Sequence, residues 1–214
     1  QPVNTVALSE KRRPEVVERV QAAVRSGARV YWVCPLIEES EHLESEAAEP
    51  TAAALAEALP DVRVGLIHGR MASADKERVM KAFAQGKVQL LVATTVIEVG
   101  VDVPAATLMI IENAERLGLS QLHQLRGRVG RGRDSSACVL LYRSPLATMA
   151  RARLDVLRGT NDGFEVAQRD LELRGPGEVL GTRQTGLMQL RVADLVRDAD
   201  LMPAVQELAE KLAA

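Results

Sequence analysis

The feature that most constrains the fold is an alternation of short apolar runs with longer stretches whose apolar residues recur at helical spacing. Unbroken apolar runs are typical of strands that helices cover on both faces, and strands that alternate with helices form parallel sheets. We therefore predict an α/β fold with about five parallel strands and flanking helices, and ligands at the carboxyl ends of the strands. The predicted strands are residues 29–34, 62–67, 88–93, 107–111 and 137–141.

The predicted helices lie between these runs and continue beyond the last one. Gly27 is a plausible left-handed cap for the first helix, and Ser73 can cap the third, which ends near Gly86. We expect a sheet domain over residues 1–143, followed over 144–214 by a mainly helical segment with a helical hairpin and a glycine-rich loop. The predicted helices are residues 14–25, 51–59, 73–86, 119–129, 146–158, 164–173 and 200–212.

The charge of the chain is nearly balanced, with a formal net charge of −2. An overall basic field therefore cannot attract a nucleic acid, and any positive surface must be local. A local patch exists, because Arg116, Arg126, Arg128, Arg131 and Arg133 fall in one short stretch. Acidic residues gather in residues 38–49.

Two cysteines, Cys34 and Cys138, lie inside apolar runs and are expected to be small core residues in a reducing cytoplasm. No charged and then apolar leader opens the chain, and no apolar run approaches the roughly 20 residues that span a bilayer. Secretion and membrane insertion are therefore not expected. The first residue, Gln1, fits an excised domain or a processed product.

The segment QLHQLRGRVGRG, residues 121–132, carries the strongest chemical signal. Arg128 and Arg131 stand three residues apart in it, so we expect them to share one helical face. Two planar guanidinium groups that converge suit an anionic ligand such as a triphosphate, and an arginine finger stabilises the charge that develops in phosphoryl transfer. The plainer alternative is a solvated basic helix end.

This segment resembles motif VI of superfamily 2 helicases. The resemblance implies a RecA-like domain in which Gln124, Arg128 and Arg131 face ATP bound between two such domains. The run LLVATTVIEVGVDVP, residues 90–104, resembles motif V of the same helicases. That resemblance implies a DNA-phosphate contact by Thr94 together with Thr95, and an approach to the nucleotide by Gly100 and Asp102.

His68 and Gly69 follow a predicted strand and resemble the helicase motif whose backbone amides touch the tracking strand. A lone histidine at a strand end is otherwise an ordinary turn or core residue. The three histidines have no partner at metal-ligand spacing and no CxxC occurs, so we expect no metal site. The glycines of residues 127–132 have the wrong spacing for a dinucleotide site.

Residues 111–132 resemble the RecG family of DNA helicases and the related coupling factor Mfd, and residues 160–195 favour RecG. In this pair the second segment couples motor strokes to movement along a duplex. Pro176 between two glycines supports a hinge or latch, although an ordinary helix-terminating turn is the alternative. The resemblance selects Arg174, Gly175, Gly177, Gly181 and Gln184 as coupling residues.

No GxxxxGK[ST] phosphate loop and no acidic box for Mg²⁺ occur in the chain, so half of an ATPase site is missing. The resemblance implies that a preceding RecA-like domain holds most of the ATP and Mg²⁺, and that a wedge domain grips branched double-stranded DNA. A full-length protein of this family, expected to be a monomer, would remodel stalled forks and Holliday junctions in recombination and repair. We expect this chain alone to be inactive.

Two other functions remain as alternatives. A non-enzymatic DNA-binding module would also use the arginine cluster and would explain the incomplete ATPase site. A small-molecule α/β enzyme could use Asp102 or His68 as an acid or base, but the sequence offers no convincing pair of nucleophile and base.

Overall fold

The computed structural model describes residues 2–35, 41–94, 103–132 and 134–174. The chain divides into two compact units, Gln1–Ala167 and Gln168–Ala214. The first unit contains the whole sheet. The described part of the second unit is the end of one helix, where Arg169 pairs with Glu172 at 2.8 Å.

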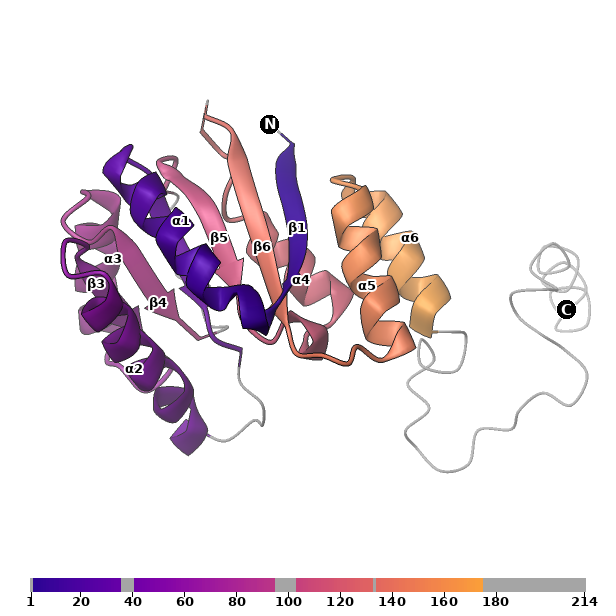
Figure 1. Cartoon of the computed structure of the whole chain (residues 1–214), viewed down its shortest axis with the longest axis horizontal. Coiled ribbons are helices and arrows are strands. Elements are labelled where there is room, and N and C mark those ends of the chain that lie inside the picture. Colours follow the sequence, from indigo (N-terminus) through magenta and orange to yellow (C-terminus); the bar gives the residue numbers. More distant parts are fainter. Residues whose placement is uncertain (1, 36–40, 95–102, 133, 175–214) are drawn as a thin grey trace, which may run out of the picture. The chain divides into compact units, whose positions relative to one another are not determined.

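The sheet confirms the predicted fold class, because all of its strand pairs are parallel (Figure 1). The five predicted strands are all present, and the sheet also contains a strand at the start of the chain. Within the described residues the six strands follow the order β1-β6-β5-β2-β4-β3. Their bounds are β1 (Val3–Ser9), β2 (Arg29–Val33), β3 (Val64–Ile67), β4 (Leu90–Ala93), β5 (Ala106–Ile111) and β6 (Ser136–Tyr142).

The additional strand β1 lies at an edge of the sheet and pairs with β6 from Val3↔Ser136 to Ser9↔Tyr142. The prediction of about five strands was one short because β1 has the weak pattern of an edge strand. Only Val3 and Thr5 in it are buried, and Asn4 is exposed. An edge strand needs less apolar sequence than a central one.

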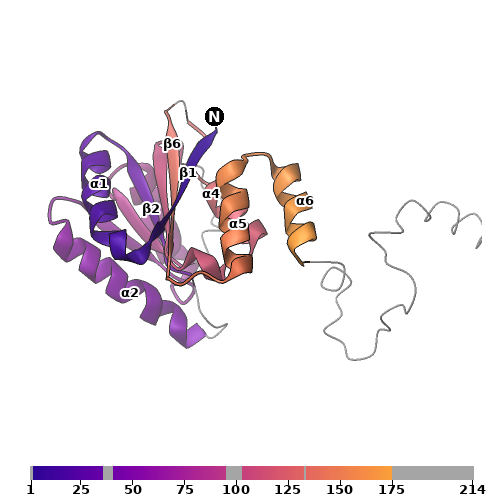
Figure 2. The same cartoon turned by 45° about the vertical axis from the view of Figure 1, so that its right-hand side comes forward.

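The helices cover both faces of the sheet (Figure 2). Helices α1 and α2 pack on one face, where Val20 and Leu55 contact a core that includes Trp32. The ring of Phe83 from α3 lies 4.8 Å from that of Tyr31. Because neighbouring strand residues point to opposite faces, α3 covers the other face. The helices are α1 (Arg13–Arg25), α2 (Glu41–Ala58), α3 (Ser73–Ala84), α4 (Leu119–Arg126), α5 (Thr148–Gly159) and α6 (Gly163–Arg174), with 3-10 turns η1 (Glu10–Arg12) and η2 (Ala114–Arg116).

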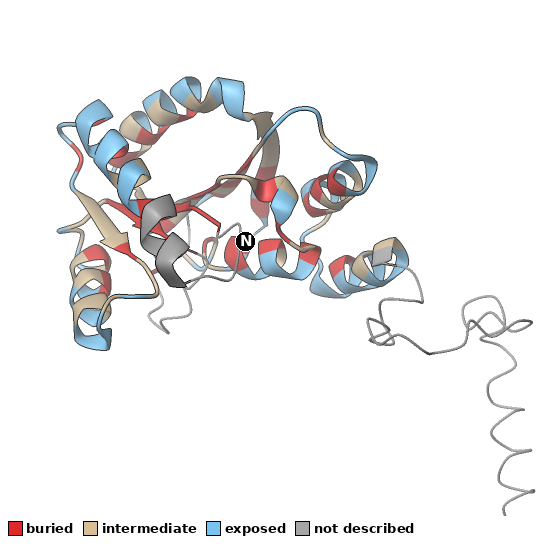
Figure 3. Cartoon of the chain, turned by 90° about the horizontal axis from the view of Figure 1, so that it is seen from below, coloured by how far each residue is buried: buried red, intermediate tan, exposed pale blue. Residues whose placement is uncertain are grey.

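The central strands are buried on both faces, and the inner sides of the helices are buried against them (Figure 3). Both cysteines are buried and free, which confirms the prediction that they are core residues. Burial raises the pKa of the Cys34 and Cys138 thiols to about 12, so neither is a reactive thiolate.

Two helix starts differ from the prediction. Helix α2 begins at Glu41 instead of residue 51 and runs through Pro50, where Ala48 and Leu55 anchor it to the core. Tertiary packing therefore overrides the local cost of the proline. Ser73 is the first residue of α3 and not its cap, because Ala72 takes the capping position and provides no side-chain hydrogen bond.

Candidate functional site

One group of predicted site residues meets at the carboxyl ends of two adjacent strands. His68 and Gly69 follow β3, and Thr94 follows β4. These strands pair up to Ile67↔Ala93, and the Thr94 amide donates to the Ile67 carbonyl at 3.2 Å. The sheet therefore brings together His68, Gly69 and Thr94, as predicted, while Thr95 lies outside the described residues. We call these three residues the carboxyl-edge site.

Polar atoms of this site lack hydrogen-bond partners. Thr94 is 1% exposed, and neither its Oγ1 nor the Nδ1 of His68 has a partner among the described residues. The other ring nitrogen of His68, Nε2, lies 3.7 Å from a carboxylate oxygen of Glu49 on α2. Most buried polar atoms in proteins are hydrogen-bonded, so unpartnered ones mark a place that a ligand can satisfy.

The turn after His68 is held by a residue that sequence reasoning missed. Lys76 Nζ, on α3, donates to the Gly69 carbonyl at 2.7 Å, and the Met71 amide donates to the His68 carbonyl at 3.2 Å. A signal for Lys76 exists in the sequence, because a lysine near a helix start opposes the helix dipole.

The arginine segment has a different geometry from the prediction. Helix α4 ends at Arg126 instead of residue 129, so Arg128 and Arg131 do not share a helical face. Gly127 caps the helix, and Gly130 has a φ of 84°, a conformation that turns the chain and favours glycine. The buried Val129 anchors the resulting turn. We call residues 127–132 the arginine turn.

The arginine turn packs against the segment that resembles motif V. A Cβ added to Gly132 would lie 2.5 Å from the Pro104 carbonyl oxygen, so only glycine fits at this approach. Pro104 lies two residues before the start of β5 at Ala106, and Gly132 lies four residues before the start of β6 at Ser136. The turn therefore lies at the amino ends of the strands. The arginines therefore do not lie at the carboxyl ends of the strands, where we expected ligands to bind, and their contact with a nucleotide stays a prediction.

The three side chains predicted to face a nucleotide are all reachable from solvent. Gln124 on α4 and Arg131 are exposed, and Arg128 is partly exposed. Arg131 Nε donates to the Gly127 carbonyl at 3.0 Å, which folds the side chain back over the end of α4. Gly100 and Asp102 lie outside the described residues.

Arg126 does not belong to an exposed basic patch, contrary to the prediction. It is 3% exposed, and its Nη1 donates to the carbonyls of Leu157 and Thr160, both at 2.7 Å. Its Nη2 lies 3.0 Å from His123 Nδ1. The side chain thus joins α4 to the end of α5, where Leu157 lies in the last turn and Thr160 follows the helix. Carbonyls in the last turn of a helix have no partner within the helix. Arg116 and Arg131 are exposed, and Arg133 lies outside the described residues.

The same contact affects the titration of His123. Burial, and then the charge of Arg126, lower the pKa of the His123 imidazole, so the ring is neutral near pH 7. A neutral Nδ1 can accept the hydrogen bond from Arg126.

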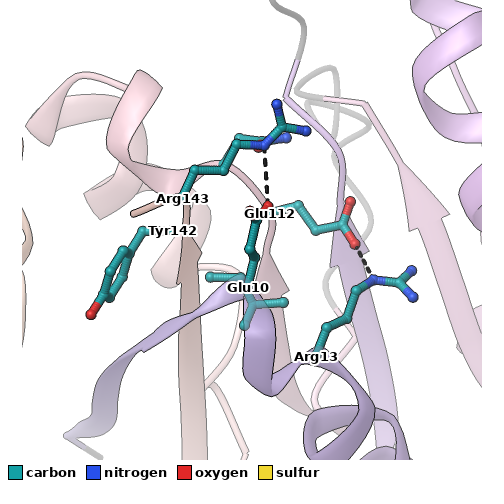
Figure 4. Close-up of a pocket in the computed structure, with 7 residues that line it drawn as sticks. Glu10, Arg13, Glu112, Tyr142 and Arg143 are labelled. Atoms are coloured by element: carbon teal, nitrogen blue, oxygen red, sulfur yellow. Dashed lines mark hydrogen bonds and ion pairs between the residues drawn. The ribbon is translucent and has the colours of Figure 1, made fainter. Parts of the chain in front are cut away.

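A separate pocket of about 180 Å³ lies at the carboxyl ends of β1, β5 and β6 (Figure 4). Arg13 pairs with Glu112 at 2.8 Å, and Arg143 pairs with Glu10 at 3.2 Å. The two ion pairs hold the ends of β1, β5 and β6 together. The charges of these four side chains are matched in pairs. No predicted site residue lines it.

Within the described residues, no group of three or more His, Cys, Asp or Glu side chains is placed to hold a metal ion. Across those residues, no helix combines the length and the apolar character that crossing a bilayer requires. The predicted coupling residues 175–184 lie outside the described residues, as does the Arg174 side chain.

Comparison with protein families matches these elements to a known domain. Residues 13–133, more than half of the chain, match the helicase conserved C-terminal domain. The chain belongs to this helicase family. Residues 160–214 match the C-terminal part of domain 3 of the ATP-dependent DNA helicase RecG, which places the helicase domain in the RecG branch.

Individual relatives agree with this assignment. The chain is 63% identical over 211 residues to the ATP-dependent DNA helicase RecG of Acidithiobacillus ferridurans and 61% identical over 212 residues to that of Escherichia coli K12. Each match covers 99% of the chain and 31% of the relative, so the chain spans about a third of these proteins.

Solved structures show the same relationship. A RecG bound to a three-way DNA junction superposes with a TM-score of 0.73 at 43% identity, covering 94% of this chain and 26% of that one. The C-terminal domain of the DEAD-box protein Dbp5 superposes with a TM-score of 0.52 at 16% identity, covering 78% of this chain and 94% of that one. At that identity the second likeness concerns the fold alone, and it supports the RecA-like sheet.

Proposed function

We propose that this helicase domain is the second motor domain of an ATP-dependent DNA helicase or translocase that remodels branched DNA. Its targets would be stalled forks and Holliday junctions, in recombination and repair. Support comes from the RecG relatives and from the RecG structure that holds a three-way DNA junction.

One observation carries the proposal. The carboxyl-edge site follows β3 and β4, whereas the arginine turn precedes β6 and contacts Pro104 shortly before β5, so the two lie at opposite edges of one sheet. The segment that resembles motif V contributes a residue to each. Thr94 is in the first, and Pro104 contacts Gly132 in the second. A motor needs this arrangement, because the nucleotide and the DNA must act on one rigid body through different surfaces.

The arginine turn would act on ATP held mainly by the preceding RecA-like domain. The guanidinium groups of Arg128 and Arg131 can only donate hydrogen bonds, and the side-chain amide of Gln124 carries an N–H donor. These groups would stabilise the negative charge that moves on the γ-phosphate during transfer. Arg131 would exchange its bond to the Gly127 carbonyl for one to phosphate. Gly100 and Asp102 would approach the nucleotide from the same segment as Pro104. The Mg²⁺ that accompanies ATP would be bound mainly by the preceding domain.

The carboxyl-edge site would grip DNA through its backbone. A hydroxyl, an imidazole and backbone amides at strand ends bind phosphate without distinguishing bases, which a motor moving along any sequence requires. Thr94, with Thr95, and the turn at His68 and Gly69 would provide these groups. The unpartnered Thr94 Oγ1 and His68 Nδ1 are the atoms that DNA would satisfy.

The remaining partners are other parts of the same protein. We propose that the preceding RecA-like domain and a DNA-binding wedge domain complete the monomeric motor in the cytoplasm. The segment with Arg174, Gly175, Gly177, Gly181 and Gln184 would couple domain closure to movement on the duplex. The division at residue 143 that we propose between motor and coupling segment stays a prediction.

The decisive test is the DNA-stimulated ATPase activity of the full-length protein with Arg128→Ala or Arg131→Ala. Loss of an arginine finger should lower kcat at least about 100-fold without weakening DNA binding. The control is Arg25→Ala, which removes an exposed arginine paired only loosely with Asp61, at 3.7 Å. A loss below tenfold in both arginine variants would contradict the proposal.

A second measurement addresses the alternative of a DNA-binding module without enzymatic activity. In the full-length protein, salt-dependent DNA binding that neither ATP nor its hydrolysis changes would favour that alternative. For the 214-residue chain alone we expect no ATP hydrolysis, since its sequence contains no phosphate loop. Turnover by the pure chain that Arg131→Ala abolishes would contradict this expectation.

A further inference from the structure

We propose that Lys76 is an additional DNA-backbone contact of the carboxyl-edge site, held in place by its hydrogen bond to the Gly69 carbonyl. This inference rests on the proposed function, because it assumes that DNA phosphates pass over His68, Gly69 and Thr94. The ligand class is the phosphodiester backbone.

The position of Lys76 is fixed by the turn that it holds. Its Nζ lies 2.7 Å from the Gly69 carbonyl oxygen, and its side chain is partly buried. An ammonium group has three N–H donors, and one of them serves Gly69. The structure gives the other two no partner among the described residues, so they are available to a phosphate that contacts the amides of this turn.

The location of the charge supports a functional role. Lys76 lies in the first turns of α3, which begins at Ser73 and has no side-chain cap. The partial positive charge of a helix N-terminus disfavours a cation there and favours an anion. A lysine in this position is a local inconsistency that a bound phosphate would resolve, because the ammonium and the helix N-terminus would then attract the same group.

Neighbouring groups complete the surroundings. Thr94 Oγ1 and His68 Nδ1 are buried and unpartnered among the described residues, so the site already presents two atoms that a ligand would satisfy. Glu49 lies 3.7 Å from His68 Nε2.

The test measures DNA affinity of the full-length protein against salt concentration, using fluorescence anisotropy with a branched DNA. Each phosphate contact adds about 0.7 to 0.9 to the slope of log Kd against log salt. Lys76→Met should lower the slope by about this amount and weaken binding about fivefold to tenfold at 0.1 M salt. Lys76→Arg should retain the slope, because it keeps the charge.

Two further variants separate charge from folding. Lys76→Gln keeps a donor for the Gly69 carbonyl but removes the charge, so it should lower the slope of log Kd against log salt as Lys76→Met does. The same result from both variants would not depend on whether the turn is intact. Lys81→Met removes an exposed lysine from the other end of α3 and should leave the slope unchanged. Unfolding temperatures of all variants identify any that fail to fold.

An unchanged slope in Lys76→Met and Lys76→Gln would overturn the assignment, as would an equal loss in Lys81→Met. If the unsubstituted protein binds DNA and hydrolyses ATP while the Lys76 variants keep its slope, only the Lys76 inference is wrong. If the unsubstituted protein shows no DNA-dependent ATPase activity, the proposed function fails, and this inference fails with it.

Discussion

The two ends of the sheet differ in what builds their sites. At the carboxyl ends, His68, Gly69 and Thr94 follow adjacent parallel strands directly, so the pairing of β3 with β4 brings them together. At the amino ends, Arg128 and Arg131 depend on a turn in which Gly127 ends the helix and Gly130 redirects the chain. Strand-end sites follow from sheet topology, whereas turn sites depend on the backbone conformation of individual residues. The two should therefore respond separately to substitution.

The largest difference between the effects on ATPase activity and on DNA binding is expected for Gly132→Ala. Its Cβ would lie 2.5 Å from the Pro104 carbonyl oxygen, and a backbone atom cannot move aside cheaply. Displacing the arginine turn by about 1 Å should lower the DNA-stimulated kcat of the full-length protein about 100-fold, with DNA affinity unchanged. Gly159→Ala is the control, because an added Cβ there meets nothing within 4 Å. Equal losses of kcat and DNA affinity would show that the two ends are not independent.

The next effect is on stability and concerns the joint between α4 and α5. Arg126→Met should lower the free energy of unfolding by about 2 to 4 kcal/mol, because the carbonyls of Leu157 and Thr160 lose a buried donor. Urea unfolding of the 214-residue chain measures this. Arg158→Met removes an exposed arginine paired with Asp155 and should change stability by less than about 0.5 kcal/mol. A similar small change for Arg126→Met would refute its role as the joint.

A smaller and purely functional effect is expected for Thr94→Val. Replacing an unpartnered buried hydroxyl by a methyl group should leave stability unchanged or raise it. It should weaken DNA binding by about 1 kcal/mol, roughly fivefold, since a hydrogen bond to phosphate is lost. Thr5→Val, at a buried threonine whose hydroxyl donates to the Val3 carbonyl, provides the control for DNA affinity. DNA affinity equal to that of the parent in Thr94→Val would remove Thr94 from the site.

The smallest effect is a pH dependence near the α4–α5 joint. Burial and the charge of Arg126 lower the pKa of His123 in the folded chain, so as pH falls the unfolded chain takes up a proton first, near its ordinary pKa of about 6.5. Stability should therefore be constant above that pH and decline slightly below it. Urea unfolding of the chain and of His123→Asn between pH 7.5 and 5.5 should show a shallower decline in the variant. Parallel curves would exclude His123 as the cause.

The sequence predicted the part of the fold that depends on strong repeated patterns. Runs such as 88–93 are apolar enough to be strands in any parallel sheet, and the pairing of β3 with β4 then positions the carboxyl-edge site. Strand β1 was missed because Asn4 and Thr5 interrupt its apolar pattern. The N-terminal extension of α2 was missed because packing of Ala48 outweighs the local effect of Pro50.

The geometry of the arginines was beyond sequence reasoning for a different reason. A helical pattern is continuous through Val129, whose burial comes from the turn and not from a helix. Arg126 has the same charge as its neighbours, yet it is buried because two carbonyls at the end of α5 need a donor. Residues distant in the sequence determine both the burial of Val129 and that of Arg126. Lys76 was missed because its partner, Gly69, is itself a loop residue.

The pairing of β1 with β6 has a practical consequence for anyone who isolates this domain. The helicase family match covers residues 13–133 and so contains neither strand. A piece cut to those limits would leave β5 as a bare, strongly apolar margin with unpaired amides and carbonyls, a template for association with other copies. The seven residues of β1 thus cover the edge of β6, a strand that begins more than a hundred residues later in the chain.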